Sequence, residues 1–307
     1  MSIRFDDRVA VITGAGNGLG RSYAMYLASR GARVVVNDLG GQADGSGQST
    51  APAQMVVDEI KAAGGEAVAS FDDVSQFEGA GNLIRQAQDH FGPPDILICN
   101  AGILRDKSFA GMAMEDFEAV LRVHLLGTVY VTRAAWPLMK ARGYGRIVFT
   151  TSVSGLYGNF GQANYSAAKL GIVGLMNSLK LEGEKYNIRV NTIAPIAASR
   201  LGAGIFPDEA MPLLKPEYVT AAVAWLCSEQ CLATGDIIAA GAGRFAKAQI
   251  VESPGICFPP NQEVTPEMVA ENYAGICDMT GAQAFDRSHD AVIKLFEMLT
   301  GRKESES

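Results

Sequence analysis

Short runs of apolar, mostly β-branched residues alternate with longer amphipathic stretches along the chain, as far as about residue 240. Nearly continuous apolar strands suit a parallel sheet that is buried on both faces, and strands alternating with helices are typical of right-handed βαβ units. The sequence therefore predicts an α/β protein with a doubly wound parallel sheet of about seven strands. The predicted strands are Arg8–Thr13, Arg33–Asn37, Glu66–Ser70, Asp95–Cys99, Arg146–Thr151, Arg189–Ile193 and Asp236–Ala240.

Amphipathic segments with helical periodicity fill the intervals between these strands and recur near the end of the chain. A Gly/Ser-rich stretch, Gly40–Pro52, predicts a mobile surface loop after the second strand. The alternation stops near residue 243, so we expect one domain over residues 1–242 and an extension over residues 243–307 that packs on this domain or on a partner subunit. The predicted helices are Leu19–Arg30, Ala53–Ala63, Phe77–Phe91, Met114–Ala141, Ala163–Tyr186, Pro216–Ser228 and Ser288–Leu299.

Composition and charge argue against several classes of protein. The net charge of -7 and the pI near 5.1 do not suit a nucleic-acid-binding protein, and no apolar run is long enough to predict a membrane span. The chain enters its first strand without a signal-peptide segment and lacks a terminal Ser-Lys-Leu, so we expect a cytoplasmic location rather than a peroxisomal one. The cysteines form neither an even disulfide framework nor a zinc set, and we expect buried, reduced thiols and no metal. They are Cys99, Cys227, Cys231, Cys257 and Cys277.

A glycine-rich turn, TGAGNGLG over residues 13–20, follows the first predicted strand and opens the next helix. Glycines let the backbone approach a pyrophosphate closely, and a helix N-terminus offers unpaired N–H groups and a positive dipole end. The turn therefore predicts a dinucleotide site, the alternative being a tight turn without a ligand. The expected cofactor residues here are Gly14, Asn17, Gly18, Leu19 and Gly20.

Polar or small residues also follow the next three strands, where open parallel sheets bind ligands. Asp38 ends the second strand, where a carboxylate hydrogen-bonds adenosine ribose hydroxyls and repels a 2′-phosphate, and no arginine follows it directly. This pattern favours NAD over NADP as cofactor, although the same side chain could serve only its own turn. Beyond the third and fourth strands we expect cofactor contacts from Asp73, Val74, Asn100, Ala101 and Gly102.

The stretch NYSAAK, residues 164–169, places Tyr165 and Lys169 at positions i and i+4, on one face of a predicted helix. A free tyrosine has a pKa near 10, and a cation within about 4–6 Å lowers this pKa because it favours the phenolate. We therefore predict that Lys169 depresses the pKa of Tyr165 and makes it a general acid or base. The alternative is a chance pair on a surface helix.

Together these motifs resemble the short-chain dehydrogenase/reductase family over residues 5 to about 242. TGAGNGLG, CNAG, Ser152 and YSAAK occur in the order and spacing of that family. VVVNDLGG, NAGILRDKSF, YGNFGQANYSAAKLG and the ICD of the extension are similar to the (3R)-hydroxyacyl-CoA dehydrogenase unit of peroxisomal type-two multifunctional enzymes. The resemblance implies a Rossmann-like fold, NAD as cofactor, and an extension used partly for dimer packing, hence a homodimer or homotetramer.

The resemblance also implies the catalytic roles. Tyr165 exchanges a proton with the substrate oxygen, and Ser152 hydrogen-bonds and orients that oxygen. Lys169 holds the nicotinamide ribose and lowers the pKa of the tyrosine. Ser152 taken alone is a common residue at a strand end, but its position thirteen residues before Tyr165 favours the catalytic role.

Two positions depart from the general family. His124 stands where an asparagine supports a water relay, and it either supports that relay or is a satisfied core group. Pro195 is followed by Ile196 where Pro-Gly is usual, and we expect Ile196 to offer main-chain groups to the carboxamide of the cofactor. The apolar loop Leu201–Leu214 predicts a lid over an apolar substrate, or else an ordinary loop.

The leading hypothesis is NAD-dependent oxidation of a (3R)-hydroxyacyl-CoA to the 3-oxoacyl-CoA. A steroid alcohol or a steroid side-chain acyl-CoA is the alternative substrate. A non-catalytic nucleotide-binding scaffold is a third possibility, disfavoured because all three catalytic residues are present. Arg105, Lys107 and Arg200 are the candidates for binding the phosphates of CoA.

Overall fold

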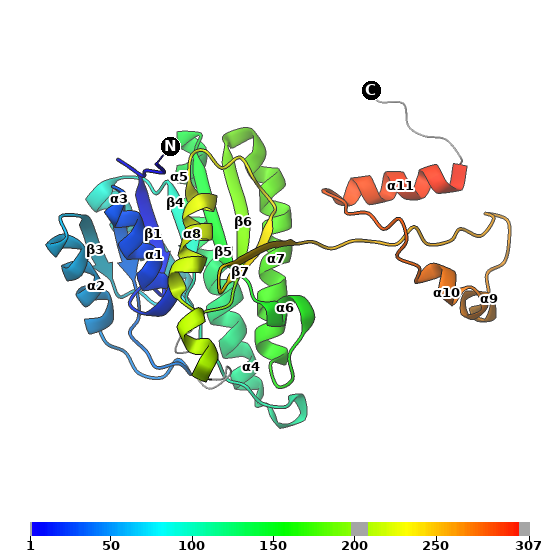
Figure 1. Ribbon diagram of the computed structural model, residues 1–307, viewed down its shortest axis with the longest axis horizontal. Helices are drawn as coiled ribbons and strands as arrows, with labels where there is room; N and C mark the ends of the chain where they lie inside the picture. Colours follow the sequence, from blue (N-terminus) through cyan, green and yellow to red (C-terminus); the bar gives the residue numbers. More distant parts are fainter. Residues whose placement is uncertain (1, 198–207, 301–307) are drawn as a thin grey trace. The chain divides into compact units, whose positions relative to one another are not determined.

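The computed structural model describes residues 2–197 and 208–300. The chain divides into two compact units, residues 1–247 and 248–307. The first unit is built on one eight-stranded sheet in the order β3-β2-β1-β4-β5-β6-β7-β8, with β1 to β7 parallel (Figure 1). The predicted α/β doubly wound fold is therefore confirmed. The strands are β1 Val9–Thr13, β2 Arg33–Asn37, β3 Glu66–Ser70, β4 Ile96–Cys99, β5 Gly145–Thr150, β6 Ile188–Pro195, β7 Ile237–Gly241 and β8 Arg244–Ala248.

The sheet has eight strands rather than the predicted seven, because β8 lies in the segment that was expected to be extension. β8 follows β7 after Ala242 and Gly243, whose φ angles of 50° and 78° have the sign that a two-residue hairpin turn requires. Its side chains are exposed or partly exposed, as suits an edge strand. β8 therefore lacks the buried apolar run by which the other strands could be recognised.

Helices cover both faces of the sheet (Figure 1). On one face α1 contacts both α2 and α8, and on the other α5 contacts α3 and α7 while α4 packs on α7. The strands between these layers are almost wholly buried because their side chains are apolar on both faces. The helices are α1 Gly18–Ser29, α2 Ala51–Ala62, α3 Phe77–Phe91, α4 Met114–Leu121, α5 Gly127–Arg142, α6 Val153–Tyr157, α7 Ala163–Gly183 and α8 Pro216–Cys227.

The helix predicted over Met114–Ala141 is interrupted by one turn of different geometry. Between α4 and α5, residues Arg122–Leu126 form a π-helical turn, η2. Such turns are rare and are frequent at functional sites. The buried side chain of His124 projects from this turn.

The second unit contains α9 (Pro266–Glu271), α10 (Tyr273–Ile276), α11 (Ser288–Thr300) and one antiparallel bridge, Glu252 to Gln283. None of its described residues is buried. Over the described ranges of both units, no helix is long and apolar enough to cross a membrane, and no group of acidic, histidine and cysteine side chains could hold a metal ion.

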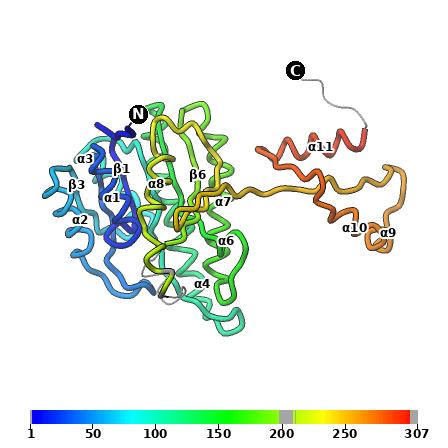
Figure 2. The backbone as a smooth tube through the Cα atoms, viewed as in Figure 1, coloured from blue at the N-terminus to red at the C-terminus, as the bar shows by residue number. Residues whose placement is uncertain are grey.

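The strand order reverses between β1 and β4. After β3 at one edge the chain returns to the middle of the sheet and then builds outward in the opposite direction (Figure 2). Open α/β sheets bind ligands outside the carboxyl ends of the strands at such a switch point. The loops that follow β1 and β4 therefore define where a site is expected.

Candidate active site

The loops after β1 and β4 are joined directly by hydrogen bonds. The backbone N–H groups of Asn100 and Ala101 donate to Oγ1 of Thr13 at 3.0 and 3.1 Å. The side-chain amide of Asn100 donates to the carbonyl of Gly14 at 3.0 Å. A Cβ atom on Gly14 would lie 2.8 Å from Cα of Ala101, and its φ is 63°, so only glycine fits between the loops.

The start of α1 is suited to binding phosphate. Its N-cap residue, Asn17, makes no side-chain hydrogen bond to the first turn, and that turn contains no acidic residue. The first N–H groups of a helix have no partner within the helix and attract anions. Gly20 serves packing instead, because a Cβ atom there would lie 2.1 Å from the carbonyl oxygen of Gly14. A pyrophosphate therefore fits the residues present at this turn.

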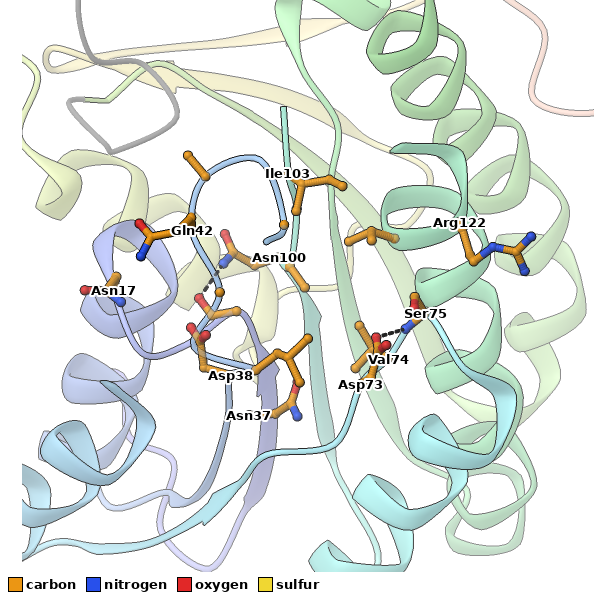
Figure 3. Close-up of a pocket in the computed structure, with 18 of the residues that line it drawn as sticks. Asn17, Asn37, Asp38, Gln42, Asp73, Val74, Ser75, Asn100, Ile103 and Arg122 are labelled. Atoms are coloured by element: carbon orange, nitrogen blue, oxygen red, sulfur yellow. Dashed lines mark hydrogen bonds between the residues drawn. The ribbon is translucent and has the colours of Figure 1, made fainter. Parts of the chain in front are cut away.

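A cavity of about 370 Å³ opens beside this turn (Figure 3). It has a second wall that sequence reasoning missed, formed by Gln42, Ala43 and Gly45 from the loop after β2 and by Ile103 after β4. The glycine and serine content of that loop indicated only mobility. Of the expected cofactor residues, those lining the cavity are Gly14, Asn17, Gly18, Leu19, Asp38, Asp73, Val74, Asn100, Ala101 and Gly102, whereas Gly20, Tyr165, Lys169, Pro195 and Ile196 do not line it.

The carboxylate of Asp38 is fixed at the wall of this cavity. One oxygen accepts the N–H of Gly16 at 2.8 Å and the other accepts the N–H of Gly40 at 2.7 Å. A carboxylate oxygen can accept two hydrogen bonds, so each retains capacity for a ribose hydroxyl. The carboxylate is thus held in a fixed orientation at the wall of the cavity.

The carboxyl end of β5 is bound to α7. Oγ1 of Thr151 donates to the carbonyl of Lys169 at 2.7 Å, and the Lys169 ammonium donates to the carbonyl of Thr150 at 2.6 Å. Ser152 caps the start of α6, where its hydroxyl accepts the N–H of Ser154 at 3.1 Å. The first two contacts hold the end of β5 against α7 at Lys169, and the third fixes Ser152 at the start of α6.

Tyr165 lies beside both groups. The Lys169 nitrogen is 5.5 Å from the centre of its ring, and the Ser152 hydroxyl is near enough to influence the pKa of the phenol. Burial raises the pKa of Tyr165, the hydrogen bond from Ser152 acts in the opposite direction, and the charge of Asp106 adds to the rise. The prediction that Lys169 depresses the pKa of Tyr165 is therefore wrong for this structure. Burial also lowers the pKa of Lys169 to about 7, so the lysine is only partly cationic at neutral pH.

His124 packs against Tyr165. Its ring meets the ring of Tyr165 edge to face, with centres 5.1 Å apart. Nε2 lies 3.0 Å from the N–H and 2.8 Å from the carbonyl of Ile103, whereas Nδ1 is buried with no hydrogen-bond partner among the described residues. Burial first, and then the charge of Lys169, lowers the pKa of His124 well below its usual value. His124 is thus a neutral, buried group that orders the loop after β4.

The remaining expectations concern Ile196, the arginines proposed to bind CoA, and the loop predicted to form a lid. The N–H of Ile196 donates to the carbonyl of Ala240 at 2.8 Å, so this group belongs to the sheet and is not offered to a carboxamide. Arg105 binds the carbonyl of Asp44 and the carboxylate of Asp116. Arg200 and the expected lid up to residue 207 lie outside the described residues, and η5 (Asp208–Leu213) follows.

Three of the five cysteines are buried as expected. Cys257 and Cys277 are exposed, because they belong to the second unit, in which no described residue is buried. All five are free thiols. The expectation that the cysteines as a set are buried is therefore wrong for these two.

A glycine turn at the switch point, an acidic side chain after β2, and a serine, a tyrosine and a lysine gathered after β5 define a nicotinamide-dependent oxidoreductase. Residues 8–200 match the family described as short chain dehydrogenase. The chain belongs to the short-chain dehydrogenase/reductase family, whose members use NAD or NADP.

Relatives with this fold cover most of the chain. It is 51% identical over 281 residues to the peroxisomal multifunctional enzyme type 2 of Mus musculus, covering 91% of this chain and 38% of the mouse protein. The structure of full-length peroxisomal multifunctional enzyme type 2 from Drosophila melanogaster superposes with a TM-score of 0.84 at 40% identity, covering 99% of this chain and 51% of that one. A 7α-hydroxysteroid dehydrogenase complexed with NADH and 7-oxo glycochenodeoxycholic acid gives a TM-score of 0.70 at 30% identity, covering 78% and 95%. The chain thus spans about half or less of the length of the two multifunctional relatives.

Proposed function

We propose that this dehydrogenase oxidises a (3R)-hydroxyacyl-CoA to the 3-oxoacyl-CoA with NAD. The observation that carries the proposal is the convergence of Ser152, Tyr165 and Lys169 at the carboxyl edge of the sheet, next to a cavity walled by Asp38. The similarity to multifunctional enzymes over 91% of the chain supports an acyl-CoA as substrate. The residues that would hold the dinucleotide are those of the glycine turn, Asp38 and the loops after β3 and β4.

NAD, when bound, supplies the acceptor of the hydride from the hydroxyl-bearing carbon. Tyr165 accepts the hydroxyl proton, and Ser152, which lowers the pKa of the tyrosine, orients the substrate oxygen toward it. Because burial raises the pKa of Tyr165, the neighbour that favours its phenolate is the hydroxyl of Ser152. His124 keeps the tyrosine ring in place through its edge-to-face contact and is a positioning residue.

A panel of substrates tests the proposal directly. The purified full chain is assayed with NAD and straight-chain 3-hydroxyacyl-CoA thioesters of both configurations, steroid side-chain acyl-CoA thioesters, and free steroid alcohols. We expect the highest kcat/KM with the straight-chain (3R) thioesters. A higher kcat/KM for a steroid alcohol would favour the alternative function, which the steroid bound in the hydroxysteroid dehydrogenase relative supports.

Removal of one phenolic oxygen separates an enzyme from a nucleotide-binding scaffold. Tyr165→Phe is expected to lower kcat by at least about 10²-fold, the scale of general acid–base catalysis, while NAD binding is kept. Tyr157, exposed on α6, offers the matched control Tyr157→Phe. Absence of turnover in the wild type, with NAD bound normally, would indicate the scaffold.

We also propose a homodimer or homotetramer in which the second unit packs on the dehydrogenase unit or on a second copy. The support is that α11 exposes apolar side chains, among them Val292, Leu295 and Phe296. Light scattering of the full chain and of a variant truncated after residue 248 tests this proposal. A cytoplasmic location stays a prediction, which imaging of a tagged chain can test against the peroxisomal location in the names of the relatives.

A further inference from the structure

The loop between β2 and α2, residues 39–50, reaches across the cofactor cavity to the segment that follows β4. The carbonyl of Ala43 accepts the N–H of Leu104 at 2.9 Å, and the carbonyl of Asp44 accepts Nε–H of Arg105 at 2.8 Å. A Cβ atom on Gly45 would lie 3.0 Å from the side chain of Ile103, so the two segments are in close contact. Figure 3 shows the loop that carries Gln42 arching toward Ile103. The loop that its composition predicted to be mobile is thus held to the segment after β4 in this structure.

The loop is folded on itself and has glycines near both ends. Asp44 accepts the N–H and the hydroxyl of Ser46 at 2.9 and 2.7 Å, and the N–H of Gln42 donates to the carbonyl of Ser46 at 2.7 Å. Gly40 and Gly47 both have a φ of 73°. These contacts favour movement of the tip as one piece, with the change in backbone angles taken up at the glycines.

The other side of the contact is anchored to the catalytic helix. The carbonyl of Arg105 accepts the side-chain N–H of the fully buried Asn164 at 3.0 Å, and Oδ1 of Asn164 accepts the N–H of Tyr165 at 2.7 Å. Next to it, the carboxylate of Asp106 accepts the side-chain N–H of Gln162 at 2.7 Å. The segment after β4 is therefore fixed at the start of α7, and the loop is the side free to move.

Arg105 is the only described side chain shown to join the two segments by a charge-assisted hydrogen bond. Nε binds the carbonyl of Asp44, while Nη1 binds the carboxylate of Asp116 on α4 at 3.0 Å. The planar guanidinium makes both contacts at once, which a lysine ammonium on a flexible stem does less well. Because Gln42 and Ala43 line the cavity, a dinucleotide held there lies beneath the loop.

We infer that Arg105 is a positioning residue that clasps the 39–50 loop over the bound dinucleotide, and that this clasp must open for the cofactor to leave. Arg105 also lines the cavity itself, and the role assigned to it here is to hold the loop through Asp44. The inference rests on the proposed use of the cavity for NAD, but it does not depend on which alcohol is oxidised.

The test measures NADH release from the full chain. Arg105→Met removes the guanidinium but keeps much of the apolar stem, and it is expected to raise the dissociation rate of NADH by at least about tenfold, in stopped-flow fluorescence, the change that about 1.4 kcal/mol of lost contact produces. The dissociation constant of NAD from calorimetry and the KM for NAD should rise in parallel, while kcat at saturating NAD does not fall. Arg105→Lys should recover part of the loss.

Two further variants keep the result interpretable. Asp116→Asn weakens the clasp from the α4 side and should change NADH release in the same direction, though less. Arg85→Met, on the exposed face of α3, makes the same change of charge away from the cavity and should leave release unchanged. Release and affinity within twofold of wild type in Arg105→Met would overturn the inference. A wild type that binds NAD but does not oxidise hydroxyacyl-CoA would refute only the proposed substrate.

Discussion

Replacement of Gly102 by alanine tests how tightly His124 holds the loop after β4. A Cβ atom on Gly102 would lie 2.2 Å from Cε1 of His124 and 2.9 and 3.0 Å from its two ring nitrogens. Favourable contacts between carbon atoms lie at about 3.5–4.0 Å. The imidazole or the backbone of residue 102 must therefore move by about 1 Å or more.

A shift of this size breaks the contacts of the ring. Nε2 of His124 now lies 3.0 Å from the N–H and 2.8 Å from the carbonyl of Ile103, and the ring is almost wholly buried. Overpacking a core costs about 1–3 kcal/mol, and leaving a buried polar group unpaired costs about 1–3 kcal/mol. We expect Gly102→Ala to lower the free energy of unfolding by about 2–6 kcal/mol.

Urea unfolding followed by circular dichroism measures this difference, provided the slope with urea is unchanged. Gly81→Ala is the matched control, because a Cβ atom there meets nothing within 4 Å and α3 should gain up to about 1 kcal/mol. In the double variant Gly102→Ala/His124→Ala the ring is gone, so the two losses should fall short of additivity by at least about 1 kcal/mol. Additive losses, or a Gly102→Ala protein as stable as wild type, would refute the steric reasoning.

Three further predictions concern charge. Asp38→Ala removes the carboxylate that repels a 2′-phosphate, so the ratio of kcat/KM for NAD to that for NADP should fall at least about tenfold in steady-state assays; an unchanged ratio would contradict the assignment. Burial lowers the pKa of Lys169 to about 7, against 10.5 for an exposed lysine. Between these two pH values the unfolded chain binds a proton that the folded chain lacks. The resulting loss of stability is largest near pH 7 and disappears near pH 10.5. Unfolding of wild type should therefore become harder with rising pH, relative to Lys169→Met, by up to about 1.4 kcal/mol per pH unit, and parallel pH profiles would contradict this. The carboxylate of Asp95 is fully buried and pairs with two partly exposed arginines, Arg8 and Arg142. Asp95→Asn should therefore lower the free energy of unfolding in urea by about 1–3 kcal/mol. Glu229→Gln, at an exposed ion pair, should cost less than about 0.5 kcal/mol, and equal losses in the two variants would argue against burial as the cause.

Most of the sheet and its covering helices could be predicted from apolar patterns alone. The predicted bounds of β2, β3 and α3 match those in the structure, because the apolar pattern of a buried strand or an amphipathic helix can be recognised within a few residues. β8 was not predicted, because the side chains of this edge strand are exposed or partly exposed and so show no buried apolar pattern. The short helix α6 was not predicted either, because five residues are too few to show a helical period.

The sequence predicted which residues gather at the site better than it predicted the directions of their pKa shifts. Spacing alone placed Tyr165 and Lys169 on one helix face, and the structure brings Ser152 to them. The sign of the pKa shift depends on how deeply each group is buried, which spacing does not encode. The contribution of the loop after β2 to the cavity wall could not be predicted either, because its contacts with Ile103 and Arg105 join segments about sixty residues apart.

The π-helical turn between α4 and α5 bears on how this chain is compared with others. An α-helix rotates about 100° with each residue, and a turn closed by i to i+5 bonds takes up one extra residue without adding that rotation. Val131, Ala135 and Met139, which are buried on α5, keep their inward direction because the turn absorbs this surplus residue. Deleting one position from Arg122–Leu126 would restore a regular α-helix and leave that apolar stripe facing inward. An alignment drawn without an offset at this point would therefore match inward-facing positions of one protein with outward-facing positions of the other.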